Sequence, residues 1–155
     1  MKTTFTYRNN RKLAIAVLAF GLFLSNSCEV ANDVLGNETV AAIEGEWGVE
    51  EESQFYKKST MIPNTYSVFI TIDPDNPNGV IIDGFYHVNI SIKASVSGST
   101  ITILEQSAHD ENTQYDYTVS GSGSLTGNLK EISWNYVVND GSTVSDHCTA
   151  TYTKK

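Results

Sequence analysis

The chain has 155 residues, with 18 acidic and 10 basic side chains and a formal net charge of −8. Four of the basic residues (Lys2, Arg8, Arg11 and Lys12) lie at the start, so residues 28–155 carry a net charge of −12 and no arginine. Proteins that bind nucleic acid present a basic face, and this composition predicts no nucleic-acid partner. The 128 residues from position 28 onward are enough for one domain with its own core.

Residues 1–27 are predicted to be an export signal. The basic start is followed by twelve apolar or small residues at 13–24 and by a short polar stretch that ends at Ser27. Twelve residues are too few to span a bilayer, which takes about 20, but they suit a cleaved signal. Because Cys28 follows directly, the segment resembles that of bacterial lipoproteins. The resemblance implies acyl chains such as palmitate on Cys28, which would anchor the protein to the outer membrane at its periplasmic face or at the cell surface. The alternative is an ordinary signal whose cleaved product starts with cysteine.

Residues 28–42 are predicted to be a tether and residues 43–155 a domain of β-strands. After position 42, apolar and polar residues alternate with the period of two that is typical of strands. Turn residues such as those at 73–79 and 139–142 separate the segments. The expected strands lie near residues 46–52, 66–72, 80–82, 86–96, 101–106, 115–125, 132–138 and 144–153.

This pattern predicts an all-β protein in which about eight antiparallel strands follow one another in an up-and-down meander. Short connections favour antiparallel neighbours, and no segment after residue 42 shows helical spacing. Closure into a β-barrel would pair every strand edge. A two-sheet β-sandwich is the alternative.

One short motif points to a family. Gly45-Glu46-Trp47 matches the Gly-x-Trp motif of lipocalins, and the domain resembles small lipocalin-like lipoproteins of Gram-negative bacteria. The resemblance implies an eight-stranded barrel in which Trp47 closes one end. Lipocalins usually pack an arginine from the last strand on this tryptophan; since arginine is absent here, Lys154 or Lys155 would substitute in part.

A barrel of this size either fills with its own side chains or holds one small ligand. The first hypothesis is therefore a non-catalytic module that binds a small apolar or amphipathic ligand inside the barrel. The residues predicted to contact such a ligand are aromatic residues with polar groups, namely Tyr66, Tyr86, Tyr115, Tyr117 and Trp134.

The second hypothesis is a filled barrel that binds a protein or a glycan through its loops, as an interaction or inhibitor module. The loop at 54–65 is unusually apolar, and its candidate contact residues are Phe55, Tyr56, Met61 and Ile62.

Residues for catalysis or metal binding are not apparent in the sequence. No nucleophile motif, phosphate loop or metal-ligand spacing occurs, so we expect no enzyme activity, no metal and no cofactor. Cys148 is predicted to be a small buried residue in a strand, with His147 on the opposite face. The run Glu50–Glu52 is interpreted as a charged strand end.

Overall fold

The computed structural model describes residues 38–55 and 64–155. The predicted signal, Cys28 and the loop residues Tyr56, Met61 and Ile62 lie outside the described residues. Within the described ranges, no helix combines the length and the apolar character that crossing a membrane requires.

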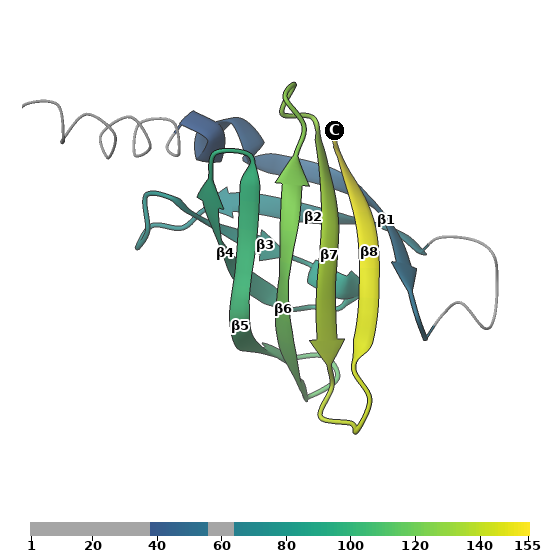
Figure 1. The fold of residues 1–155 in the computed structure, drawn as a ribbon. Helices are drawn as coiled ribbons and strands as arrows, with labels where there is room; N and C mark the ends of the chain where they lie inside the picture. Colours follow the sequence, from purple (N-terminus) through teal and green to yellow (C-terminus); the bar gives the residue numbers. More distant parts are fainter. Residues whose placement is uncertain (1–37, 56–63) are drawn as a thin grey trace, which may run out of the picture.

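Eight antiparallel strands form one closed barrel, in which each strand pairs with its neighbours in sequence and β8 pairs with β1 (Figure 1). This confirms the predicted up-and-down barrel, and the two-sheet sandwich is wrong. The strands are β1 (Gly45–Ser53), β2 (Asn64–Ile72), β3 (Gly79–Asp83), β4 (Ser91–Ser97), β5 (Thr100–Asp110), β6 (Tyr115–Leu125), β7 (Glu131–Asn139) and β8 (Asp146–Lys154).

Alternate residues of each strand point into the barrel, as the period of two predicts. In β7, for example, the inward residues are buried, whereas most of the outward ones are exposed. The interior is rich in large side chains, and those with under 2% exposure include Trp47, Trp134, Tyr152, Phe85 and Ile132.

One end of the barrel, which we call the closed end, is sealed by the segment that precedes β1. Residues 38–43 are helical (Figure 1). The side chains of Val40 and Ile43 are fully buried in the core. Trp47 Nε1 donates a hydrogen bond of 2.8 Å to the Ile43 carbonyl. The Lys154 ammonium lies 5.8 Å from the centre of the Trp47 ring and donates to the Ala42 carbonyl. Of the two terminal lysines, Lys154 is therefore the one that covers Trp47.

Two glycines in β6 make room for aromatic side chains inside the barrel. A Cβ at Gly121 would lie 2.5 Å from the Cβ of Tyr136 and 2.6 Å from the Asn135 carbonyl oxygen. A Cβ at Gly123 would lie 2.8 Å from the Trp134 ring. Tyr136 and Trp134 therefore rest directly on the β6 backbone.

The β4–β5 boundary is the shortest seam of the wall. Backbone pairing between these strands covers Ser95–Ser97 and Thr100–Thr102, and a β-bulge follows in β5 between Ile103 and Gln106. Beyond it, the Gln106 side-chain amide accepts from the Lys93 N–H (2.9 Å) and donates to the Lys93 carbonyl (2.6 Å). One side chain thus replaces a missing pair of ladder hydrogen bonds.

Two expected elements have different bounds. The strand predicted for 86–96 begins only at Ser91, because a short 3-10 helix, η2 (Phe85–His87), precedes it. Tyr86 and His87 adopt positive φ angles of 57°, which is incompatible with a strand. The strand predicted for 101–106 is longer than expected, since β5 continues to Asp110.

We predict that Gly121→Ala destabilises the barrel by about 1–3 kcal/mol, because the added methyl group overlaps Tyr136 and Asn135. Urea unfolding, followed by tryptophan fluorescence, measures this change. Gly127→Ala is the matched control, since a Cβ there meets no atom within 4 Å. Equal stability of the two variants would contradict the proposed overlap.

Candidate functional site

The end of the barrel opposite the closed end, where β1 finishes and β8 begins, contains buried acidic groups. We call it the polar end. The alternation of β1 continues inward from Trp47 and Val49 to Glu51 and Ser53, and Glu51 is only 1% exposed. Across the wall, Glu51 is level with Ala150 of β8 and Asn64 of β2. A carboxyl group therefore lies among apolar and aromatic side chains.

Only one of the two Glu51 carboxyl oxygens is satisfied. Oε2 accepts hydrogen bonds from the hydroxyls of Tyr66 (2.5 Å) and Tyr136. Oε1 is buried and has no hydrogen-bond partner among the described residues, and the same is true of the Tyr152 hydroxyl and Trp134 Nε1. Buried polar groups are nearly always paired, so these three atoms are unusual and mark a place where a partner is missing.

Burial raises the pKa of Glu51, and the nearby charge of Asp146 raises it further. The hydrogen bonds from Tyr136 and Tyr66 and the proximity of His87 act in the opposite direction without reversing the shift. Burial likewise raises the pKa of the Tyr136 hydroxyl, which stays protonated and donates to Glu51 Oε2.

Asp146, the first residue of β8, has the opposite character. Its carboxylate accepts from the Ser53 and Tyr86 hydroxyls and from the backbone N–H of Gln54 (2.9 Å) and Phe55 (3.4 Å). Burial alone would raise the pKa of Asp146, but these hydrogen bonds outweigh it and lower the pKa. Asp146 is thus an ionised, well-satisfied group that fixes the end of β1.

A third buried acid, Asp110, belongs to a turn. It accepts from Asn112 N and Thr113 Oγ1, both at 2.8 Å, and such contacts are typical of an Asx-type turn. Cys148 is 3% exposed, as predicted, while His147 lies on the outer face. Burial raises the pKa of the Cys148 thiol, which is therefore a poor nucleophile.

The structure brings together four of the five predicted ligand-contact residues. Tyr66 and Tyr86 are half-buried at the polar end, and Tyr117 is 8% exposed with its ring edge towards Tyr86 at 6.3 Å. Trp134 lies inside and packs on Tyr152 with ring centres 5.6 Å apart. Tyr115, at the start of β6, is instead 60% exposed.

Glu51 and Asp146 were not anticipated from the sequence. Glu50–Glu52 do lie at the end of β1, but the burial of Glu51 was not identified, although the alternation from Trp47 through Val49 places it inward. Of the loop residues, Phe55 is 49% exposed. Among the described residues, no group of three or more histidine, cysteine, aspartate or glutamate side chains is placed to hold a metal ion.

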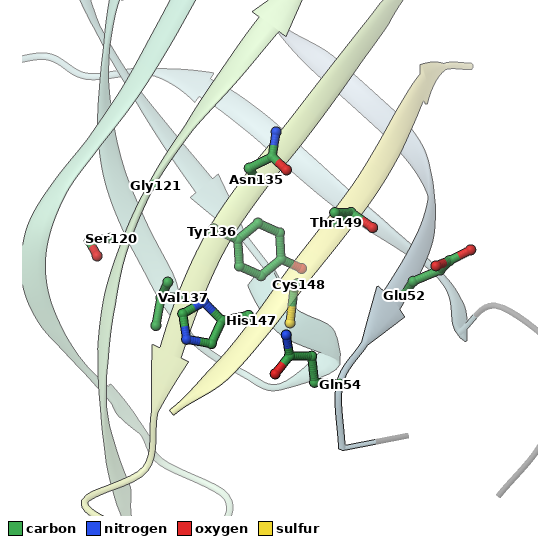
Figure 2. A pocket seen from close by; sticks show the side chains of 10 residues that line it. All are labelled: Glu52, Gln54, Ser120, Gly121, Asn135, Tyr136, Val137, His147, Cys148 and Thr149. Carbon is green, nitrogen blue, oxygen red and sulfur yellow. The ribbon is translucent and has the colours of Figure 1, made fainter. Parts of the chain in front are cut away.

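A separate groove of about 320 Å³ crosses the outer wall (Figure 2). It is built from cross-strand pairs on β7 and β8, Asn135 with Thr149 and Val137 with His147. Glu52 and Gln54 from the β1 side and Ser120 from β6 complete it. This surface mixes hydroxyl, amide and imidazole groups with apolar atoms, so it offers hydrogen bonds to a partner.

We predict that Glu51→Gln removes a pH dependence of stability. The ordinary pKa of a glutamate is 4.5, and Glu51 in the folded protein keeps its proton to a higher pH than this. The stability that this proton gives is therefore present at low pH and lost as pH rises through the raised value. We subtract the free energy of unfolding of the variant from that of the wild type. This difference should fall by ~1 kcal/mol or more between about pH 4 and about pH 8. Chemical unfolding at several pH values measures it.

The control is Glu50→Gln, which changes the exposed neighbour of Glu51 on the same strand. Its stability should follow that of the wild type across the same pH range. A constant difference between wild type and Glu51→Gln would contradict the raised pKa of Glu51.

Comparison with known proteins adds no family to this description. No family model matches the chain, and no curated protein matches it either.

Proposed function

We propose that this chain is a membrane-anchored, lipocalin-like bacterial lipoprotein whose barrel binds a small amphipathic ligand at its polar end, without catalysis. The observation that supports this most directly is the buried Glu51 Oε1, which has no hydrogen-bond partner within residues 38–55 and 64–155. A binding site typically combines an apolar wall with a few convergent polar groups and a perturbed pKa, and the polar end has all three.

The distribution of side chains along the barrel supports a shallow site. Near the closed end the interior is filled by Trp47, Tyr152 and Ile132, each fully buried. Towards the polar end, the inward side chains of β8 are Asp146 and the small residues Cys148 and Ala150. A ligand would therefore occupy the polar end rather than the full length of the barrel.

The stacked pair of Tyr66 and His87, with ring centres 5.2 Å apart, borders this region. Tyr86 borders it as well, so a ligand that enters the polar end would meet aromatic faces first and the Glu51 carboxyl group below them.

The length of the tether limits how far the barrel can lie from its anchor. Eleven residues separate Cys28 from Val40, whose side chain is buried at the closed end. Fully extended, this stretch reaches about 40 Å. An acylated Cys28 would therefore keep the closed end within about this distance of the outer membrane, on its periplasmic or external side.

The second candidate is an interaction or inhibitor module that binds a protein or a glycan. The outer groove favours it, because Gln54, Asn135, Thr149 and His147 offer hydrogen-bonding groups on an accessible face. The exposed ring of Phe55 at the end of β1 would add an apolar contact.

Native mass spectrometry of the full chain, purified in a mild detergent after incubation with host lipids and metabolites, tests the leading proposal. We expect a retained, stoichiometric small-molecule mass in the wild type and a weaker one in Glu51→Gln, with Glu50→Gln unchanged. A bare protein mass in all three would overturn binding within the barrel and favour the outer groove.

Anchoring is tested separately with Cys28→Ser. The variant should move from the membrane fraction to the soluble fraction and lose the mass of its acyl chains. Cys148→Ser changes the only other cysteine and should leave the protein in the membrane fraction. Retention of Cys28→Ser in the membrane would overturn the lipid anchor.

A further inference from the structure

We propose that the polar end of the barrel selects an organic ammonium group, with Glu51 Oε1 as its acceptor and the surrounding tyrosine rings as its walls. This inference rests on ligand binding within the barrel and specifies the charge of that ligand.

The charge balance of the polar end favours a cation. Its buried acids, Glu51, Asp110 and Asp146, have no lysine or arginine among the described residues that lies beside them. The four lysines of the described part are elsewhere. Lys93 pairs with Asp73, Lys154 covers Trp47 and Lys155 pairs with Glu46, while Lys130 is exposed at the start of β7. Among the described residues, an anionic ligand would meet only like charge here, and a neutral ligand would form no ion pair with Glu51.

Hydrogen-bonding capacity distinguishes Glu51 from the other two acids. Asp146 accepts four hydrogen bonds, and Asp110 is occupied by its own turn. Glu51 uses Oε2 alone, and its Oε1 is buried without a partner among the described residues. An N–H⁺ donor would satisfy Oε1 with a charge-assisted hydrogen bond, which is among the stronger kinds.

Tyrosine side chains suited to a cation gather at the polar end. Tyr66 and Tyr136 contact the Glu51 carboxyl group through their hydroxyls. The ring of Tyr86 lies edge-on to Tyr117 at 6.3 Å. Aromatic faces attract ammonium groups through their quadrupoles, so the walls and the acceptor favour the same charge.

The affinity of this site for an ammonium ligand should depend on pH in one direction, because Glu51 exchanges a proton on binding. Glu51 tends to hold a proton in the empty barrel, and an ammonium ligand binds the ionised form, so binding releases that proton to solvent. Affinity should rise with pH until Glu51 is ionised in the free protein. The other groups that face Glu51 are Tyr66 on β2, Tyr136 on β7, Asp146, Cys148 and Tyr152 on β8, and His87 on η2.

Three probes of one shape and different charge test the proposal: 2-phenylethylammonium, 2-phenylethanol and phenylacetate. Binding to the full chain, in one detergent throughout, is measured by titration calorimetry at about pH 8. We expect the ammonium to bind about tenfold or more tightly than the alcohol and the carboxylate to bind weakest. Glu51→Gln should remove this preference, and Glu50→Gln should retain it.

A second measurement needs no variant. Repeating the wild-type titration near pH 6 in buffers of different ionisation enthalpy counts the protons released. The ammonium should release up to one proton per molecule bound, and the alcohol none.

The outcomes separate the two proposals. Equal affinities, a preference for the alcohol or carboxylate, or an ammonium preference that survives Glu51→Gln would overturn ammonium selection and leave barrel binding in place. If none of the probes binds while native mass spectrometry shows a retained ligand, ammonium selection is again wrong. If neither experiment detects a ligand, both proposals fail.

Discussion

The pairing of β1 with β8 is the constraint on which the rest of the structure depends. It closes the ring of strands, and its register decides which residues of β1 and β8 lie side by side at the two ends of the barrel. At one end it aligns Trp47 with Lys154, and at the other it aligns Ser53 with Cys148. A shift of one residue would turn Glu51 outward and an exposed neighbour inward. The closed end and the polar end are therefore both products of one register.

The polar end shows how environment separates two carboxyl groups of similar chemistry. Asp146 is surrounded by donors and is stabilised as an anion. Glu51 has two tyrosine donors on one oxygen and apolar surroundings on the other, so its ionisation is costly. A well-paired buried charge can be purely structural, whereas an incompletely paired one is difficult to explain by stability alone. This difference makes Glu51, rather than Asp146, the residue most informative about function.

Much of the architecture could be predicted from the sequence, because alternation and turn residues are local signals. The strands at 45–53, 115–125 and 131–139 follow directly from them, as does the inward position of Trp134. The 3-10 helix η2 could not be predicted, since Tyr86 and Val88 continue the alternation of β4 and only the tertiary fit of Phe85 interrupts it.

The site was less predictable than the fold. Tyr66, Tyr86 and Tyr117 were identified as inward aromatic residues, but Tyr115 has the same spacing and is exposed because β6 begins there. Glu51 was missed because three consecutive glutamates suggest a solvated surface. This local composition was given more weight than the alternation that places Glu51 inward. Its tyrosine partners come from β2 and β7, and no local pattern could have joined them to it.

The contact of Trp47 with Lys154 also affects the order in which the barrel folds. The tryptophan lies in the first strand and the lysine is the last residue of β8, so their contact spans nearly the whole domain. Contacts between such distant residues form late and slow the folding of β-proteins. Until β8 arrives, one edge of β1 stays unpaired and open to wrong partners. A chain that crosses a membrane in an extended form and starts from its N-terminus would complete its barrel only after its final residues were released.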